Sequence, residues 1–414
     1  MSAIRPVRIL ERRSFEEPLG LSVGARPLAE AEDDDGPLRL LLPPDMNDEQ
    51  LRALGADVRA LAEAGVFALG ESAYLSIEQR FVARCGGAKL ARWGVLAMVR
   101  VVGEGAQAVL PHERTFPHAT LDRVQAFDET GLMIAPILLT FDAAADGVAE
   151  LHARATDLGG WAGVDGVETR VGRFAAKDGA AFEAMVGERP LVIADGHHRY
   201  QAAVRHYEEL VAKGATEDVL ERASYVPALL VCESDPGLVI DPTHRLVCGV
   251  ADFDADAFLD ALAPWVDVSD TVGAPGGGTG TRNEGVLLVF RGGRQVRVRP
   301  KAEAVLRTHP ALASRSAASL AVDVAWLHEV VVRGALGLEP GSDAWKQHIR
   351  FLVGEADAGV LETVSNANVL MVVRATAMAE VRAVAAAGEF LPQKATAFFP
   401  KAPAGLVAHF VRSL

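Results

Sequence analysis

The chain has 414 residues, of which 50% are hydrophobic and 23% are charged, so it contains enough apolar material for more than one core. Its formal net charge of −14 opposes binding to nucleic acid or to an anionic membrane surface, because both repel an acidic protein. The three cysteines, Cys85, Cys232 and Cys248, form no C-x-x-C pair, which argues against a disulfide framework or a zinc ribbon. No apolar signal sequence or membrane span is evident, so we expect a cytoplasmic protein that binds neither nucleic acid nor membrane.

The first half of the chain divides into two predicted regions. Residues 1–45 form a divergent N-terminal segment with little hydrophobic pattern and an acidic run. Residues 46–180 form an N-terminal α/β region. Nearly continuous apolar runs predict buried strands at 94–102 and 136–141, and the stretch 110–122, rich in proline, histidine and charge, is interpreted as a loop.

The third region, residues 181–260, contains the most regular unit of the sequence. Leu191–Ala194 is predicted to be a short buried strand, and Asp195-Gly196 a turn that opens into an amphipathic helix. Gly214 is positioned to end this helix, and a second strand follows at 225–232. The pattern indicates a mixed α/β (α+β) fold whose core lies around residues 190–250.

The fourth region, residues 261–414, is a C-terminal α/β region in which strand and helix patterns alternate. Its glycine-rich segment 273–282 lacks the Gly-Lys-Ser/Thr ending of a nucleotide phosphate loop and is interpreted as a surface loop. Asp323 and His328 lie on an apolar helix pattern, where we interpret them as a packed pair.

The turn Asp195-Gly196-His197-His198-Arg199 is the strongest candidate for a functional site. A strand that turns directly into a helix aims several backbone N–H groups and the positive end of the helix dipole at one point, which attracts an anion. Gly196 allows a close approach to the backbone, and Arg199 has the geometry for bidentate phosphate binding. Asp195 is placed to hold a metal ion or to orient a hydroxyl nucleophile. The alternative is that Asp195 only caps the helix and the histidines are satisfied polar residues.

Three further polar clusters are candidates to converge on this turn. Each is also explained by a solvated loop, so their convergence is a hypothesis for the structure to test. They are His112-Glu113-Arg114-Thr115, Asp241-Pro242-Thr243-His244-Arg245, and the segment 392–401 with Lys394 and Lys401.

These motifs, in this order, resemble the bacterial domain-of-unknown-function family numbered 1015. The central match is Ala194–Tyr200, and the others are 110–115, 235–247, 324–329 and 392–401, so that the resemblance covers about residues 50–414. The central turn is also similar to the phosphate-binding turn of the ParB, sulfiredoxin and free-serine kinase superfamily. The resemblance therefore implies a ParB/serine-kinase-like core within residues 181–260.

The resemblance implies binding of a phosphate-bearing small molecule, ATP or ADP with Mg²⁺, and phosphoryl transfer to a small hydroxy amino acid such as serine or phosphoserine. A homodimer is a further prediction. The predicted catalytic residues are Asp195, His197 and Glu113, with Asp195 also as metal ligand. The predicted phosphate-binding residues are Gly196, His197, His198, Arg199, Arg114 and Lys394, and the predicted substrate-binding residues are His112, Thr243, His244, Arg245 and Lys401.

One departure from the family pattern leaves other functions open. Family members usually begin with a Pro-Pro-Tyr-Asp segment, which is not found in this chain, and Glu16 or Glu17 is a candidate to replace the groups it supplies. A nucleotide-binding regulatory protein without catalysis is therefore the second interpretation. The third is a metal-dependent phosphatase or other hydrolase with His112, His197, His198 and His244 as ligands. ParB-like DNA binding is opposed by the net charge and by the lack of a basic stripe.

Overall fold

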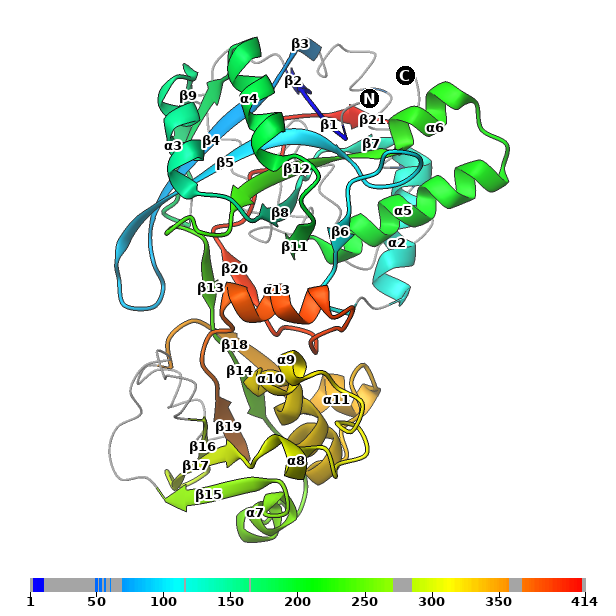
Figure 1. Ribbon diagram of the computed structural model, residues 1–414. Helices are drawn as coiled ribbons and strands as arrows, with labels where there is room; N and C mark the ends of the chain where they lie inside the picture. Colours follow the sequence, from blue (N-terminus) through cyan, green and yellow to red (C-terminus); the bar gives the residue numbers. More distant parts are fainter. Residues whose placement is uncertain are drawn as a thin grey trace.

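The computed structural model describes residues 3–10, 69–114, 117–163, 165–270, 285–356 and 367–411, together with part of a helix between 49 and 60. Most of the segment 1–45, with Glu16 and Glu17, and the glycine-rich segment 273–282 lie outside the described residues. The described residues form two units, each built on its own sheet, with a helix and a short strand pair between them (Figure 1).

A nine-stranded mixed sheet forms the first unit. Its strands run in the order β6 (Val109–Leu110), β11 (Leu191–Asp195), β8 (Ile137–Phe141), β12 (Tyr225–Cys232), β5 (Lys89–Arg100), β4 (Leu75–Val82), β10 (Glu168–Arg173), β9 (Thr156–Ala162), and β1 (Ile4–Arg5) also pairs with β5. The pairs β11–β6 and β12–β8 are parallel and the others are antiparallel. Every residue of β8 and β12 is buried, which explains their uninterrupted apolar sequences.

Helices cover one face of this sheet, and the C-terminal part of the chain covers the other. The helices of the first unit are α2 (Pro117–Thr130), α3 (Ala145–Ala153), α4 (Ala176–Val186), α5 (His197–Ala212) and α6 (Glu217–Ala223). Their apolar side chains form one core with the strands. On the opposite face, Phe398, Leu406 and Val407 pack against Leu96, Leu229 and other strand residues. The chain therefore returns, after the second unit, to complete the first.

The second unit is a six-stranded antiparallel sheet with helices on one face. The strand order is β15 (Val266–Asp270), β17 (Gln295–Pro300), β16 (Val286–Phe290), β19 (Val369–Val372), β14 (Thr243–Val247), β18 (Ile349–Val353). Its helices are α7 (Ala255–Leu262), α8 (Glu303–Leu306), α9 (Ala317–Leu320), α10 (Asp323–Trp326), a π-helix (Leu327–Ala335) and α11 (Asp343–His348). Among the described helices of this part, none is long and apolar enough to cross a membrane.

Two chain crossings connect the units. The first is β13 (Val239–Asp241), which leads into β14, and the second is β20 (Ala397–Phe399), which pairs with β13 in an antiparallel manner. Helix α13 (Met378–Ala386) lies between the units, because Val384 packs in the second core while Val381 and Ala385 pack against Val192 of the first. Short pairs β2–β3 (Val7–Leu10, Leu69–Ala73) and β7–β21 (Leu132–Met133, His409–Phe410) complete the described structure.

The mixed α/β fold expected from the sequence is confirmed, and so are the strand, turn and helix at 191–212. The organisation into regions differs from the expectation. The boundaries placed after residues 180 and 260 fall inside α4 and α7. The reason is that sequence patterns mark elements but not their partners: β8 inserts between β11 and β12, and the last strands belong to the first unit.

Candidate functional site

The candidate site begins at the turn between β11 and α5. Gly196 takes a left-handed conformation with φ 97°, and a Cβ atom there would lie 2.9 Å from Ile137 Cγ2. A side chain does not fit at this position without strain. Among the described residues no side chain caps α5, and its first turn contains no acidic residue. The first backbone N–H groups of α5 therefore keep their capacity to bind an anion.

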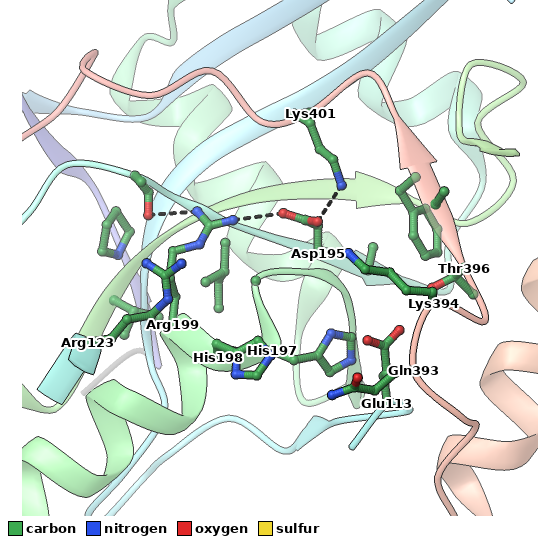
Figure 2. A pocket seen from close by; sticks show the side chains of 18 of the residues that line it. Glu113, Arg123, Asp195, His197, His198, Arg199, Gln393, Lys394, Thr396 and Lys401 are labelled. Carbon is green, nitrogen blue, oxygen red and sulfur yellow. Dashed lines mark hydrogen bonds and ion pairs between the residues drawn. The ribbon is translucent and has the colours of Figure 1, made fainter. Parts of the chain in front are cut away.

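A cavity of about 630 Å³ opens at this helix terminus (Figure 2). Its volume lies in the range typical of small-molecule sites. Phe127, Met133, Ile134, Ile137 and Val226 are among the residues of its apolar wall. The polar wall consists of Arg84, Glu113, Arg123, Asp195, His197, His198, Arg199, Thr243, Gln393, Lys394, Thr396 and Lys401.

Asp195 is the centre of a charge cluster in this wall. One carboxylate oxygen accepts from Lys401 Nζ at 2.5 Å and the other accepts from Arg199 Nη2 at 2.8 Å. Burial raises the pKa of Asp195, but the positive charges of Lys401 and Arg199 outweigh it and lower the pKa to about 2. Asp195 is therefore a fixed negative charge that holds two cations at the cavity.

Arg199 directs its guanidinium into the protein as well as toward Asp195. Its Nη1 atom donates to the Ala135 carbonyl at 3.0 Å and to the Pro136 carbonyl. These bonds tie the first turn of α5 to the segment that precedes β8. The guanidinium fork expected to grip a phosphate is thus engaged with carbonyl and carboxylate oxygens, and Arg199 shapes the turn that presents the helix N-terminus.

Two histidines pack together beside the turn. The backbone N–H of His112 donates to His197 Nε2 at 3.4 Å, and the two ring centroids are 4.6 Å apart. Burial lowers the pKa of His112 to about 4. Burial, followed by the proximity of His112, lowers the pKa of His197 well below its usual value. Both rings are therefore neutral at pH 7, and His197 accepts a hydrogen bond rather than presenting a free base to a ligand.

Glu113 presents a second carboxyl group to the cavity. It forms an isolated parallel bridge with Leu391, which fixes it beside the segment that carries Lys394. Burial raises the pKa of Glu113 to about 7, and the nearby charge of Lys394 only partly opposes this change. A carboxyl group with such a pKa can give or accept a proton at neutral pH. It is the titratable group of the cavity best matched to acid–base chemistry.

The structure brings nine of the predicted site residues into the cavity wall and leaves four outside it. The nine are Glu113, Asp195, Gly196, His197, His198, Arg199, Thr243, Lys394 and Lys401. The four outside the wall are His112, Arg114, His244 and Arg245. Of these, Arg114 is exposed, and His112 lies behind the wall in contact with His197.

His244 and Arg245, expected to bind substrate, are fully buried in the second sheet instead. The ring of His244 bonds to the Gly354 carbonyl at 2.9 Å and accepts from the Val373 N–H at 3.2 Å. Arg245 donates to the backbone carbonyls of Thr243 and Lys394, the latter at 3.0 Å, and to His328 Nε2 at 3.2 Å. The bonds of Arg245 hold the cavity-forming segment in place, whereas His244, on the other face of β14, bonds within the second unit.

Sequence reasoning missed four polar residues of the wall. Arg84 follows β4. Its guanidinium carbon lies 3.9 Å from the centroid of the Phe399 ring, and its Nη1 atom lies 3.6 Å from Asp241 Oδ2. Arg123 comes from α2. Neither arginine belongs to a motif, so no local signal marks it. Gln393 and Thr396 lie in the recognised segment 392–401 but were given no role, because their neighbours Lys394 and Lys401 carry the charge.

A metal ion on Asp195 would have to share the carboxylate with two cations, because its oxygens already accept from Lys401 and Arg199. In the described part of the chain, no group of three or more His, Cys, Asp or Glu side chains could hold a metal ion. His244 points away from the other histidines, so the set proposed for a transition metal does not converge.

Taken together, the fold and the cavity define a mixed α/β protein with a cationic site at a helix N-terminus. The chain belongs to a family described as protein of unknown function, DUF1015, whose sequence model matches residues 31–324. The match confirms the resemblance seen in the motifs, although it ends before the segment 392–401. No curated protein matches the chain.

Solved structures with some similarity include three proteins. A variant of free serine kinase in complex with ADP is 13% identical with a TM-score of 0.36, and the alignment covers 72% of this chain and 89% of that one. A conserved hypothetical protein from Pyrococcus furiosus is 14% identical with a TM-score of 0.34, covering 72% and 90%. SbnI with a C-terminal truncation, from Staphylococcus aureus, is 13% identical with a TM-score of 0.36, covering 75% and 86%. Because the TM-scores are 0.36 or lower, we infer nothing about the function of this chain from these structures.

Proposed function

We propose that the protein binds a phosphorylated small molecule, namely a nucleoside polyphosphate such as ATP or ADP, and transfers a phosphoryl group to a small hydroxy amino acid such as serine. One observation carries the proposal. The uncapped N-terminus of α5, the amino groups of Lys394 and Lys401, and the carboxyl group of Glu113 face one cavity of about 630 Å³. The first three are suited to phosphate oxygens, and the last is suited to a hydroxyl proton.

The phosphates would lie against the backbone N–H groups that follow Gly196. Lys394 and Lys401 add positive charge around Asp195 (Figure 2), and Arg84 adds more from elsewhere in the wall. Charge-assisted hydrogen bonds of this kind are the strong ones in phosphate recognition. The apolar wall around Phe127 and Met133 offers contact area for the remaining part of the ligand.

Glu113 would accept the proton of the acceptor hydroxyl. Its pKa, raised by burial to about 7, keeps a useful fraction ionised at neutral pH. Phosphoryl transfer depends mainly on positioning and on stabilising negative charge on the transferred group. The lysines supply that stabilisation from this chain's own side chains, and we assign no protein ligand to Mg²⁺.

A binding protein without turnover is the second candidate. The observation in its favour is that Asp195, the carboxylate expected to orient the acceptor hydroxyl, is engaged with Lys401 and Arg199. Glu113 is then the remaining carboxylate among the described lining residues, and catalysis depends on it alone.

Thermal unfolding with ATP, ADP, pyrophosphate and phosphoserine, each with and without Mg²⁺, tests the proposal. A ligand at 100 times its Kd stabilises the folded state by about 2.7 kcal/mol, a shift easily measured. The shift should shrink in Lys394→Gln and persist in the control Lys177→Gln, which changes an exposed lysine of α4 outside the cavity. Product analysis with ATP and serine then separates catalysis from binding. If no phosphate compound stabilises the wild type, the proposal is wrong.

A further inference from the structure

Thr396 is a hydroxyl residue in the cavity wall that the proposed function does not use. Its Oγ1 atom lies 2.9 Å from Nε2 of the buried His112 ring. Figure 2 shows Thr396 beside Lys394 on the wall that faces the α5 terminus. A hydroxyl bonded to an imidazole and flanked by cations is a recurrent arrangement of an activated nucleophile.

The tautomer of His112 sets the direction of this hydrogen bond. Burial lowers the pKa of His112 to about 4 and keeps the ring neutral, and Nδ1 has no hydrogen-bond partner among the described residues. In the tautomer with the ring proton on Nδ1, Nε2 accepts from the Thr396 hydroxyl. The hydroxyl proton then points at the ring, which leaves the oxygen lone pairs for the cavity.

The backbone around Thr396 is held on both sides. Arg245 donates to the Lys394 carbonyl at 3.0 Å, and Thr376 Oγ1 donates to the Ala395 carbonyl at 3.0 Å. On the other side, Ala397 pairs with Asp241 in the ladder between β20 and β13. Such support fixes the position of Oγ1, and a fixed nucleophile is what phosphoryl transfer requires.

We propose that the Thr396 hydroxyl accepts a phosphoryl group from a nucleoside triphosphate bound in the cavity, with His112 as the base that takes its proton. The inference rests on the proposed function, because it needs the triphosphate to bind there. Thr396 Oγ1 forms a bond to the γ-phosphorus, and the bond between that phosphorus and the β–γ bridging oxygen breaks. The nucleoside diphosphate leaves with the electron pair. The hydroxyl proton moves to His112 Nε2 and from there to an oxygen of the newly formed phosphothreonine, because the buried ring does not keep it at neutral pH.

The product is a phosphothreonine inside the cation-lined cavity. Its negative charge meets Lys394 and the α5 terminus, the same groups assigned to the ligand's phosphates. The modified protein should therefore bind ATP more weakly than the unmodified protein. The modification therefore reduces further ATP binding at the site where it occurs.

Incubation of the full chain with γ-labelled ATP, followed by phosphopeptide mapping, tests the assignment. The label should appear on Thr396 as an acid-stable phosphate, be absent in Thr396→Val, and persist in Thr396→Ser. The control Thr156→Val changes an exposed threonine of β9 outside the cavity and should keep the label. In His112→Gln the labelling rate should fall by about 100-fold while the Kd for ATP stays unchanged, since the ring acts on the hydroxyl and not on the nucleotide.

The outcomes separate the two proposals. If the wild type binds ATP and phosphorylates serine but Thr396 carries no label, the inference is overturned and the proposed function stands. An acid-labile label, or one that survives in Thr396→Val, also overturns it, because the phosphate is then on a histidine or another residue. A wild type that binds no nucleotide removes both.

Discussion

The charge in the cavity depends on two carboxyl groups, Asp195 and Glu113, whose surroundings shift their pKa values in opposite directions. Asp195 and Glu113 are both carboxyl groups of the same wall. Lys401 and Arg199 overcome the effect of burial at Asp195 and hold its pKa at about 2, whereas burial dominates at Glu113 and raises its pKa to about 7. Two like groups therefore have different roles: one anchors cations and the other can exchange a proton.

The pH dependence of Glu113 is a direct prediction. Its folded-state pKa of about 7 lies above the ordinary value of 4.5, so its contribution to stability is complete below about pH 4.5 and is lost as pH rises through about 7. Denaturant titrations across this window should show the wild type losing stability relative to Glu113→Gln as pH increases. Phosphoryl transfer should rise with pH through about 7 and fall about 100-fold in the variant. Parallel stability curves for the two proteins would contradict the assigned pKa.

Among individual residues, the sequence predicted the site best at the turn where charged residues flank Gly196. Asp195, Gly196 and the helix start were predicted and lie in the cavity wall. The use of Arg199 as an internal clamp was not predictable, because its partners are the carbonyls of Ala135 and Pro136, and any residue could supply a carbonyl. Arg84 and Arg123 were missed for the opposite reason, since long-range packing alone brings them to the wall.

Among the elements, α5 contributes most to the site through its N-terminus. Substitution of Gly196 tests this contribution. In Gly196→Ala, the methyl group meets Ile137 and the backbone stays in a left-handed conformation with φ 97°. We expect the substitution to lower the free energy of unfolding by about 2 kcal/mol. We also expect it to remove the stabilisation that the ligand gives to the wild type.

The opposite end of the same helix provides a matched control. Gly214 also has a positive φ, of 70°, but an added Cβ meets nothing within 4 Å. Gly214→Ala should therefore cost about 1 kcal/mol from backbone strain alone and leave ligand binding intact. Equal ligand affinity in Gly196→Ala and Gly214→Ala would show that the α5 terminus is not the phosphate site.

Element type was predictable where the apolar pattern is long, because burial of β12 on both faces requires a continuous apolar run and burial of one face of α5 requires a helical period. Strand pairing was not predictable, because nothing in the sequences of β8 and β12 indicates that these two strands lie next to each other. The helix expected to carry Asp323 and His328 is divided into α10 and a π-helix. His328 on this π-helix contacts Arg245 rather than Asp323, which pairs with Arg374.

At the scale of the whole molecule, Arg245 connects the second sheet to the cavity. Arg245→Met should lower the free energy of unfolding by about 3 kcal/mol, because buried carbonyls lose their donor. It should also weaken phosphate-ligand binding without touching the ligand, since Lys394 depends on its bond to Arg245. Urea unfolding and isothermal titration with ATP measure the two effects.

Arg350→Met is the control, because Arg350 is exposed on the neighbouring strand β18. It should change neither the free energy of unfolding nor that of ATP binding by more than about 0.5 kcal/mol. Unchanged ATP affinity in Arg245→Met would contradict this role.

The double crossing between the units has a consequence for synthesis. Residues of the cavity wall span positions 84 to 401, and the segment 393–401 closes the wall only after the second sheet has been made. A nascent chain on the ribosome therefore carries an open half-site with the Gly196 turn exposed from the synthesis of that turn until the last segment is made. Binding competence should appear abruptly once that last segment emerges, so a translation-arrested series would show a step in ligand capture rather than a gradual rise.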